Sequence, residues 1–106
     1  MLQEIDTEQI IKPRHWVFSI CADESLSFIF CLLVDGIIEV FHLNKKNKKY
    51  EVTPMTESNS SYTRIIYDDR HQHLIAGSKK GEIHIFKQNK SKLKFLKHQI
   101  LKAHSS

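Results

Sequence analysis

Histidine and acidic residues are the side chains of this 106-residue sequence that could bind a metal ion or transfer a proton. Seven histidines are spread along the chain, and the densest group is His71 and His73 beside Asp68 and Asp69. Two imidazoles and a carboxylate are plausible metal ligands, but a polar turn between two strands accounts for the same residues. We therefore expect a turn here, no resident metal or cofactor, and no catalytic residues, because nucleophile, phosphate-loop and zinc-hydrolase motifs are also missing.

Lysines are the second group with possible chemistry. Eight of the 16 basic residues fall in two clusters, 45 residues apart, on a chain of net charge +4. Such clusters could bind a membrane phosphoinositide, nucleic acid or an acidic protein segment. Lysines at outer loops and edge strands also prevent sheets from pairing edge to edge, and we favour this interpretation. The clustered residues are Lys45, Lys46, Lys48, Lys49, Lys87, Lys90, Lys92 and Lys94.

Two cysteines, Cys21 and Cys31, both lie in apolar runs, which predicts buried free thiols. Nothing in this pattern indicates an oxidising compartment, so we expect a cytosolic protein. The longest apolar run, residues 28–38, is interrupted by Asp35-Gly36 and is shorter than the ~20 residues of a membrane span. Residues 1–14 lack the apolar region of a secretory signal.

The apolar residues and turn dipeptides predict eight strands. The run from 26 to 34 is almost continuously apolar; a helix is the alternative, but nine residues bounded by turn signals favour a strand covered on both faces. Asp35-Gly36 and Lys79-Lys80-Gly81 predict tight turns whose glycines have positive φ, and Pro54 requires an outermost strand. The expected strands are 16–22, 26–34, 37–43, 50–56, 62–67, 74–78, 82–88 and 93–101.

These strands repeat with a period of 45 residues, which is typical of proteins built from similar β-sheet units. The step relates Gly36 to Gly81 and Phe41 to Phe86, and it predicts three segments. They are an N-terminal strand and linker at 1–14, a first repeat at 15–59, and a second repeat with the start of a further one at 60–106. Other related pairs are Phe30 and Ile75, Cys31 and Ala76, Ile38 and Ile83, and Val40 and Ile85.

The pattern resembles the WD-repeat β-propeller family. Residues 74–87, LIAGSKKGEIHIFK, match the family's Gly-Ser, two-residue turn, glycine and alternating apolar stretch that ends in an aromatic residue. Ser78 fits the family's strand serine, but the Trp-Asp dipeptide is replaced by Phe41-His42 and Phe86-Lys87. The family's Asp-His-Ser-Trp hydrogen-bond network is therefore not retained. The resemblance implies an all-β fold: two four-stranded antiparallel blades of an incomplete ring, preceded by one N-terminal strand.

The resemblance also implies a function, that of a non-enzymatic scaffold that binds other proteins. The alternative is a phosphate-binding surface for a phosphoinositide membrane or nucleic acid, formed by the lysine-rich loops between third and fourth strands. Each blade would expose an apolar outer face, which implies further propeller blades or self-association as partners. The residues expected to maintain the blades are Gly36, Gly81, Phe41, Phe86 and Ser78.

Overall fold

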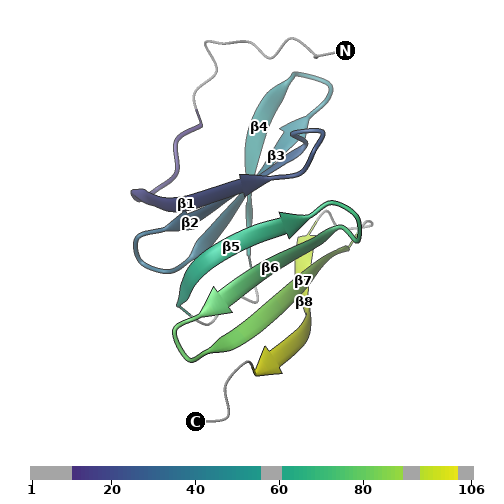
Figure 1. Ribbon diagram of the computed structural model, residues 1–106. Helices are drawn as coiled ribbons and strands as arrows, with labels where there is room; N and C mark the ends of the chain where they lie inside the picture. The colour runs from purple at the N-terminus through teal and green to yellow at the C-terminus, as the bar shows by residue number, and fades with distance from the viewer. Residues whose placement is uncertain (1–10, 56–60, 90–93, 103–106) are drawn as a thin grey trace.

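The computed structural model describes residues 11–55, 61–89 and 94–102, which form two four-stranded antiparallel sheets (Figure 1). Within each sheet the strands lie in chain order. The first sheet contains β1 (Val17–Ala22), β2 (Phe28–Leu33), β3 (Ile38–Asn44) and β4 (Lys49–Pro54). The second contains β5 (Tyr62–Asp68), β6 (His73–Ser78), β7 (Glu82–Asn89) and β8 (Lys94–Lys102). The predicted all-β fold is confirmed, and the predicted strand ends lie within two residues of the observed ones.

The N-terminal strand predicted at 1–14 falls largely outside the described residues. Its described part, 11–14, forms no strand. The start of a further repeat, predicted in LKAHSS at 101–106, falls largely outside the described residues, and its first two residues belong to β8. Pro54 is the last residue of β4, an outermost strand, as the missing N–H of proline requires.

The two predicted glycine turns are confirmed. Gly36 has a φ of 85° and Gly81 has a φ of 81°. Residues other than glycine rarely adopt such positive φ values. In the β2–β3 turn, Oδ1 of Asp35 accepts the N–H of Ile37 at 3.1 Å. In the β6–β7 turn, Oγ of Ser78 accepts the N–H groups of Lys80 and Glu82, at 3.3 and 3.2 Å. Each turn therefore combines a left-handed glycine with a side-chain oxygen that satisfies backbone donors.

The two sheets pack face to face, and we call the contacting faces the inner faces. The rings of Phe28 and Phe30 both meet Phe95 of the second sheet edge-on, with centroids 5.2 and 5.0 Å apart. Because apolar burial is the dominant favourable term in folding, this layer holds the sheets together. Its buried residues are Phe28, Phe30, Leu32, Ile38, Val40, Met55, Tyr62, Ile65, Leu74, Ala76, Phe86 and Phe95.

Each sheet also has an outer face, which points away from the other sheet. On the first sheet this face holds a smaller buried cluster of Cys31, Leu33 and Phe41. Ile11 and Tyr50 pack against that cluster and are themselves partly buried. β2 is thus buried on both faces, as its continuous apolar sequence predicts.

Hydrogen bonds join the two sheets at both ends of the strands. The carbonyl oxygen of Gly36 accepts the N–H of Tyr62 at 3.1 Å, which ties the β2–β3 turn to the start of β5. At the opposite end, Oδ1 of Asp69 accepts the N–H of Glu24 at 2.7 Å, so the β1–β2 and β5–β6 turns are also joined. The relative position of the sheets is therefore fixed by directional contacts as well as by the apolar layer.

Candidate functional site

Charged groups fix the segment before β1 to the β2–β3 turn. The N–H of Arg14 donates to Oε1 of Glu39 at 3.1 Å, and its guanidinium lies 3.1 Å from Oδ2 of Asp35. Burial by itself would raise the pKa of Asp35. The N–H of Ile37 and the Arg14 guanidinium outweigh that effect and lower the pKa below its ordinary value of 3.8. Trp16, two residues after Arg14, is consequently held at this end of the first sheet.

Several apolar side chains are exposed to solvent at the same end of the first sheet, beside the β2–β3 turn. The N–H of Val34 donates to the carbonyl oxygen of Trp16 at 2.9 Å, which places the start of β1 beside the β2–β3 turn. Trp16 is 83% exposed and Phe18 is 64% exposed. Contiguous exposed apolar groups mark sites of interaction, because water solvates them poorly. We call the following five exposed residues the apolar end surface: Trp16, Val17, Phe18, Val34 and Ile37.

A cavity of about 230 Å³ opens beside the apolar end surface, where the two sheets meet. Phe18 and Val34 line it from the first sheet, and Tyr62 and Thr63 line it from β5. Among the described residues that line the cavity, the charged one is Lys79, in the β6–β7 turn. Mostly apolar walls with a few polar groups are typical of sites that take an apolar group and orient it by a polar contact.

The predicted lysine clusters lie elsewhere. Lys87 is exposed but lies within β7 and not in a loop. Lys90 and Lys92 are outside the described residues, as is the side chain of Lys94, whose backbone begins β8. The first cluster is exposed at the β3–β4 loop and the start of β4, and comprises Lys45, Lys46, Lys48 and Lys49.

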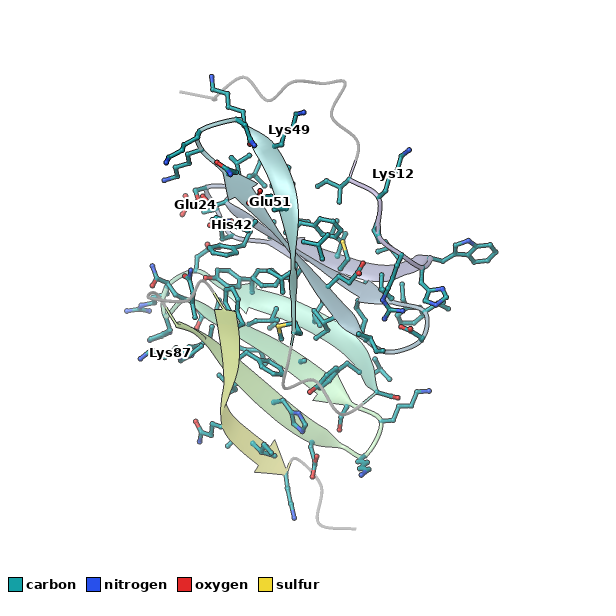
Figure 2. The ribbon with its side chains drawn as sticks, turned by 180° about the vertical axis from the view of Figure 1, so that it is seen from behind. Lys12, Glu24, His42, Lys49, Glu51 and Lys87 are labelled. Atoms are coloured by element: carbon teal, nitrogen blue, oxygen red, sulfur yellow. The ribbon has the colours of Figure 1, made fainter. Side chains whose placement is uncertain are left out.

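Acidic residues accompany the lysines. Figure 2 shows Lys49 on the first sheet and Lys87 on the second, and three further labelled side chains lie between them in that view: Glu24, His42 and Glu51. Glu51 pairs with His42 across β3 and β4, and Glu24 is joined to Asp69 of the neighbouring turn. This end of the molecule therefore carries both signs of charge, which weakens its field toward a polyanion.

One small cleft combines lysines with hydroxyl groups. It has a volume of about 250 Å³ and lies between the β1–β2 turn and the β3–β4 loop. The hydroxyl of Ser25 donates to Oδ2 of Asp23 at 2.7 Å, so a carboxylate adjoins the same cleft. An anion bound here would meet cations and hydroxyl donors, but also this negative neighbour. The lining residues are Ser25, Ser27, Leu43, Lys45 and Lys48.

The histidine pair of the β5–β6 turn makes local contacts. Nδ1 of His71 lies 2.8 Å from Oδ2 of Asp68, and this hydrogen bond lowers the pKa of the carboxyl. The rings of His71 and His73 are stacked with centroids 6.1 Å apart. Across residues 11–55, 61–89 and 94–102, no group of three or more His, Cys, Asp or Glu side chains could hold a metal ion.

A buried polar network in the second sheet was missed by the sequence analysis. The hydroxyl of Tyr62 lies 2.8 Å from Nδ1 of His84, and Nε2 of His84 lies 2.9 Å from Oε1 of Glu82. The hydrogen bond to His84 lowers the pKa of Glu82. Both ring nitrogens have partners and His84 is almost fully buried, so the network braces the β6–β7 hairpin. Tyr62 and His84 are 22 residues apart, and no sequence motif links them.

The two cysteines are free and lie on opposite faces of the first sheet. Cys21 packs against the main core, and Cys31 belongs to the outer cluster. Burial and then the neighbouring Cys31 raise the pKa of Cys21 to about 12, while burial and then Glu39 raise the pKa of Cys31 to about 11. Both thiols are therefore protonated at neutral pH, in which form they are poor nucleophiles.

The apolar end surface was also absent from the sequence prediction. The available signal was the run Trp16-Val17-Phe18 at the start of the first strand, because three consecutive apolar residues exceed what one buried face of a strand can cover. The structure adds Val34 and Ile37 by placing the β2–β3 turn alongside this run.

No protein-family model matches this sequence, and a search of curated proteins finds no match. Within the described part of the chain, no helix has the length and apolar character needed to cross a membrane.

Proposed function

We propose that the protein is a non-enzymatic scaffold that binds other proteins through the apolar end surface. The observation that carries this proposal is the exposure of Trp16 and Phe18 beside a cavity with mostly apolar walls. Aromatic side chains supply much of the binding energy in protein interfaces, because they bury a large area at little cost in entropy. Arg14 fixes the backbone that precedes Trp16, which reduces the ordering cost on binding.

We further propose that the two sheets are successive blades of a WD-repeat-like propeller. The proposal is supported by the 45-residue period, the same strand order in both sheets, and the left-handed glycines at equivalent turns. Propellers contain about 4 to 8 blades, so two sheets correspond to part of a ring. We also propose a cytosolic location, since Cys21 and Cys31 are both free thiols.

The chemistry of the surface indicates the kind of segment it would bind. An aromatic or aliphatic side chain of the partner would enter the cavity and contact Phe18 and Val34. A carboxylate next to it would pair with Lys79. We therefore expect the bound segment to be apolar with an acidic residue adjoining its anchor.

This function can be tested by selecting peptides from a random display library on the immobilised chain. Trp16 is the single tryptophan, so a peptide that covers it shifts the fluorescence emission to shorter wavelength. We expect aromatic or aliphatic anchors, and an increase in Kd of about tenfold or more for Phe18→Ser and Val34→Asp. Val52→Ser, an exposed apolar residue on the outer face, is the matched control and should leave the Kd unchanged. The proposal fails if no peptide shifts the emission, or if binding survives both substitutions.

Anion binding remains a second proposal because of the cleft lined by Lys45, Lys48, Ser25 and Ser27. Vesicles that contain a phosphoinositide should bind the chain, and binding should fall steeply as salt concentration rises. Lys45→Gln should weaken it, whereas Phe18→Ser should have no effect. Binding that is insensitive to salt would contradict this proposal.

A further inference from the structure

The outer face of the second sheet is equivalent in sequence to the inner face of the first. A step of 45 residues relates three buried inner-face residues of the first sheet to residues of the second, namely Phe30 to Ile75, Ile38 to Ile83, and Val40 to Ile85. The three isoleucines do not join the inner face of the second sheet. In β6 and β7 the buried positions are the alternate ones, which include Leu74, Ala76, His84 and Phe86. Because side chains alternate along a strand, the isoleucines lie on the outer face.

The converse also holds for the outer face of the first sheet. Its buried residues Cys31, Leu33 and Phe41 correspond to inner-face residues of the second sheet. The corresponding residues are Ala76, Ser78 and Phe86. The repeat thus has two kinds of face: one is inner in the first sheet and outer in the second, and the other is outer in the first and inner in the second. The two sheets are therefore stacked head to tail, with a face of one kind against a face of the other kind. Among the described residues, no further sheet covers the two end faces of the stack, and these end faces are again one of each kind.

The outer face of the second sheet is an apolar surface across four strands. Ile66 pairs with Ile75, which pairs in turn with Ile85, so the three side chains form a row over β5, β6 and β7. Ile83 pairs with Leu101 of β8 and extends the surface. Ile66 is 54% exposed. Aliphatic rows of this kind are otherwise buried against a second sheet.

The outer face of the first sheet is exposed at its margins. Ile20 pairs with Cys31 and is 61% exposed. Val52 pairs with Phe41 and is also exposed. Ile11 packs against the centre of this face and leaves both margins open to solvent.

We propose that the outer face of β5–β8 of one chain binds the outer face of β1–β4 of a second copy. The argument rests on the contact already present within the chain, in which faces of these two kinds pack together over the main core. The proposed contact joins two different surfaces, so it is heterologous and repeats from copy to copy. Such contacts generate a closed ring or an open filament, according to the rotation between copies. The isoleucine row would lie against Cys31, Leu33 and Phe41 of the neighbour.

The decisive experiment is a complementation test of the purified chain by light scattering and sedimentation velocity. Ile66→Asp blocks one face and Ile20→Asp blocks the other, and both residues are exposed, so the fold should be retained. The wild-type mass should rise above the 12.5 kDa of one chain as concentration increases. Each variant alone should remain monomeric. An equimolar mixture of the two should form a complex of two chains and stop there, because each variant retains the face that the other lacks.

Circular dichroism and thermal unfolding verify that both variants are folded. Val34→Asp is the matched control, since it places the same charge at an exposed apolar residue away from the outer faces. It should raise the Kd of the peptide at the apolar end surface by about tenfold or more, but its mass should rise with concentration as the wild-type mass does. This difference separates the present proposal from the proposed function. The proposal is overturned if the wild-type protein is monomeric at all concentrations. It is also overturned by a mixture that forms no complex, or by a single variant that associates as strongly as wild type.

Discussion

The β2–β3 hairpin of the first sheet and the β6–β7 hairpin of the second have the same backbone but are braced by different chemistry. Both turns contain a left-handed glycine, Gly36 or Gly81. In the second hairpin, Ser78, Glu82 and His84 form a polar, partly buried set of hydrogen bonds. The equivalent residues of the first are Leu33, Ile37 and Glu39, of which Glu39 alone is polar and is paired with Arg14.

This difference shows that turn geometry and side-chain bracing are separable in this repeat. A buried network contributes only when every donor and acceptor has a partner, so its members cannot be exchanged singly. An exposed ion pair contributes less, and salt and pH weaken it further. The second hairpin should consequently be sensitive to loss of one polar group, and the first to loss of apolar contacts and to acid.

The largest effect should come from the matched phenylalanines. Phe86→Ala opens a space between the two sheets, where the ring is fully buried, and should cost about 3–5 kcal/mol. Phe41→Ala should cost less, because Ile11 and Tyr50 are only partly buried and can move into the space. Urea unfolding followed by circular dichroism measures both. An equal or larger cost for Phe41→Ala would mean that the outer cluster is as rigid as the main core.

Loss of the Tyr62 hydroxyl tests the buried network. Tyr62→Phe leaves Nδ1 of His84 without this partner in a buried site, and should cost about 1–3 kcal/mol in the free energy of unfolding. Tyr67→Phe is the control. Tyr67 packs against the same core, but its hydroxyl makes no hydrogen bond to any described residue. Equal stabilities of the two variants in urea would show that the network contributes nothing beyond packing.

The turn glycines should differ from each other despite their similar φ. Alanine at Gly81 should cost about 1–2 kcal/mol, the usual penalty for a side chain in the left-handed region. Alanine at Gly36 should cost more, because its Cβ would lie 3.0 Å from Cα of Ser61, a backbone atom. Thermal unfolding of both variants checks the order. A Gly36→Ala protein as stable as Gly81→Ala would show that the linker at Ser61 yields without cost.

The smallest effect should come from the exposed pair of Arg14 and Asp35. The folded-state pKa of Asp35 is lowered, so its contribution to stability is present above pH 3.8 and is lost as pH falls through the lowered value. Arg14→Gln should move the pKa of Asp35 upward toward 3.8, as an NMR titration of the carboxyl carbon would report. Lys12→Gln changes an exposed lysine two residues before Arg14, serves as the control and should leave the pKa of Asp35 unchanged. An unaltered pKa in Arg14→Gln would mean that the hydrogen bond from Ile37 and the neighbouring His15 ring hold it down without Arg14.

Much of the fold could be predicted from the sequence, because its determinants are local. Asp35-Gly36 and Lys79-Lys80-Gly81 favour turns with a left-handed glycine. The apolar run at 26–34 favours a strand buried on both faces, and its central residues, Phe28–Leu33, form that strand. The candidate sites were less predictable. The lysine clusters are evident in the sequence, but the tertiary structure brings Glu24 to the same end from another turn. Glu24 is joined there to Asp69, 45 residues away.

The sequence by itself determined the eight strands, the order of the turns and the 45-residue period, because alternation and turn chemistry act over a few residues. Only the tertiary structure decided which face of each sheet is inner and which is outer. It also joined Tyr62 to His84 and Arg14 to Glu39, pairs that are 22 and 25 residues apart. The exposed position of Trp16 and Phe18 follows from the same packing. Such contacts depend on strand register and on how one sheet stacks against the other, and these are settled by the burial of the whole apolar layer at once.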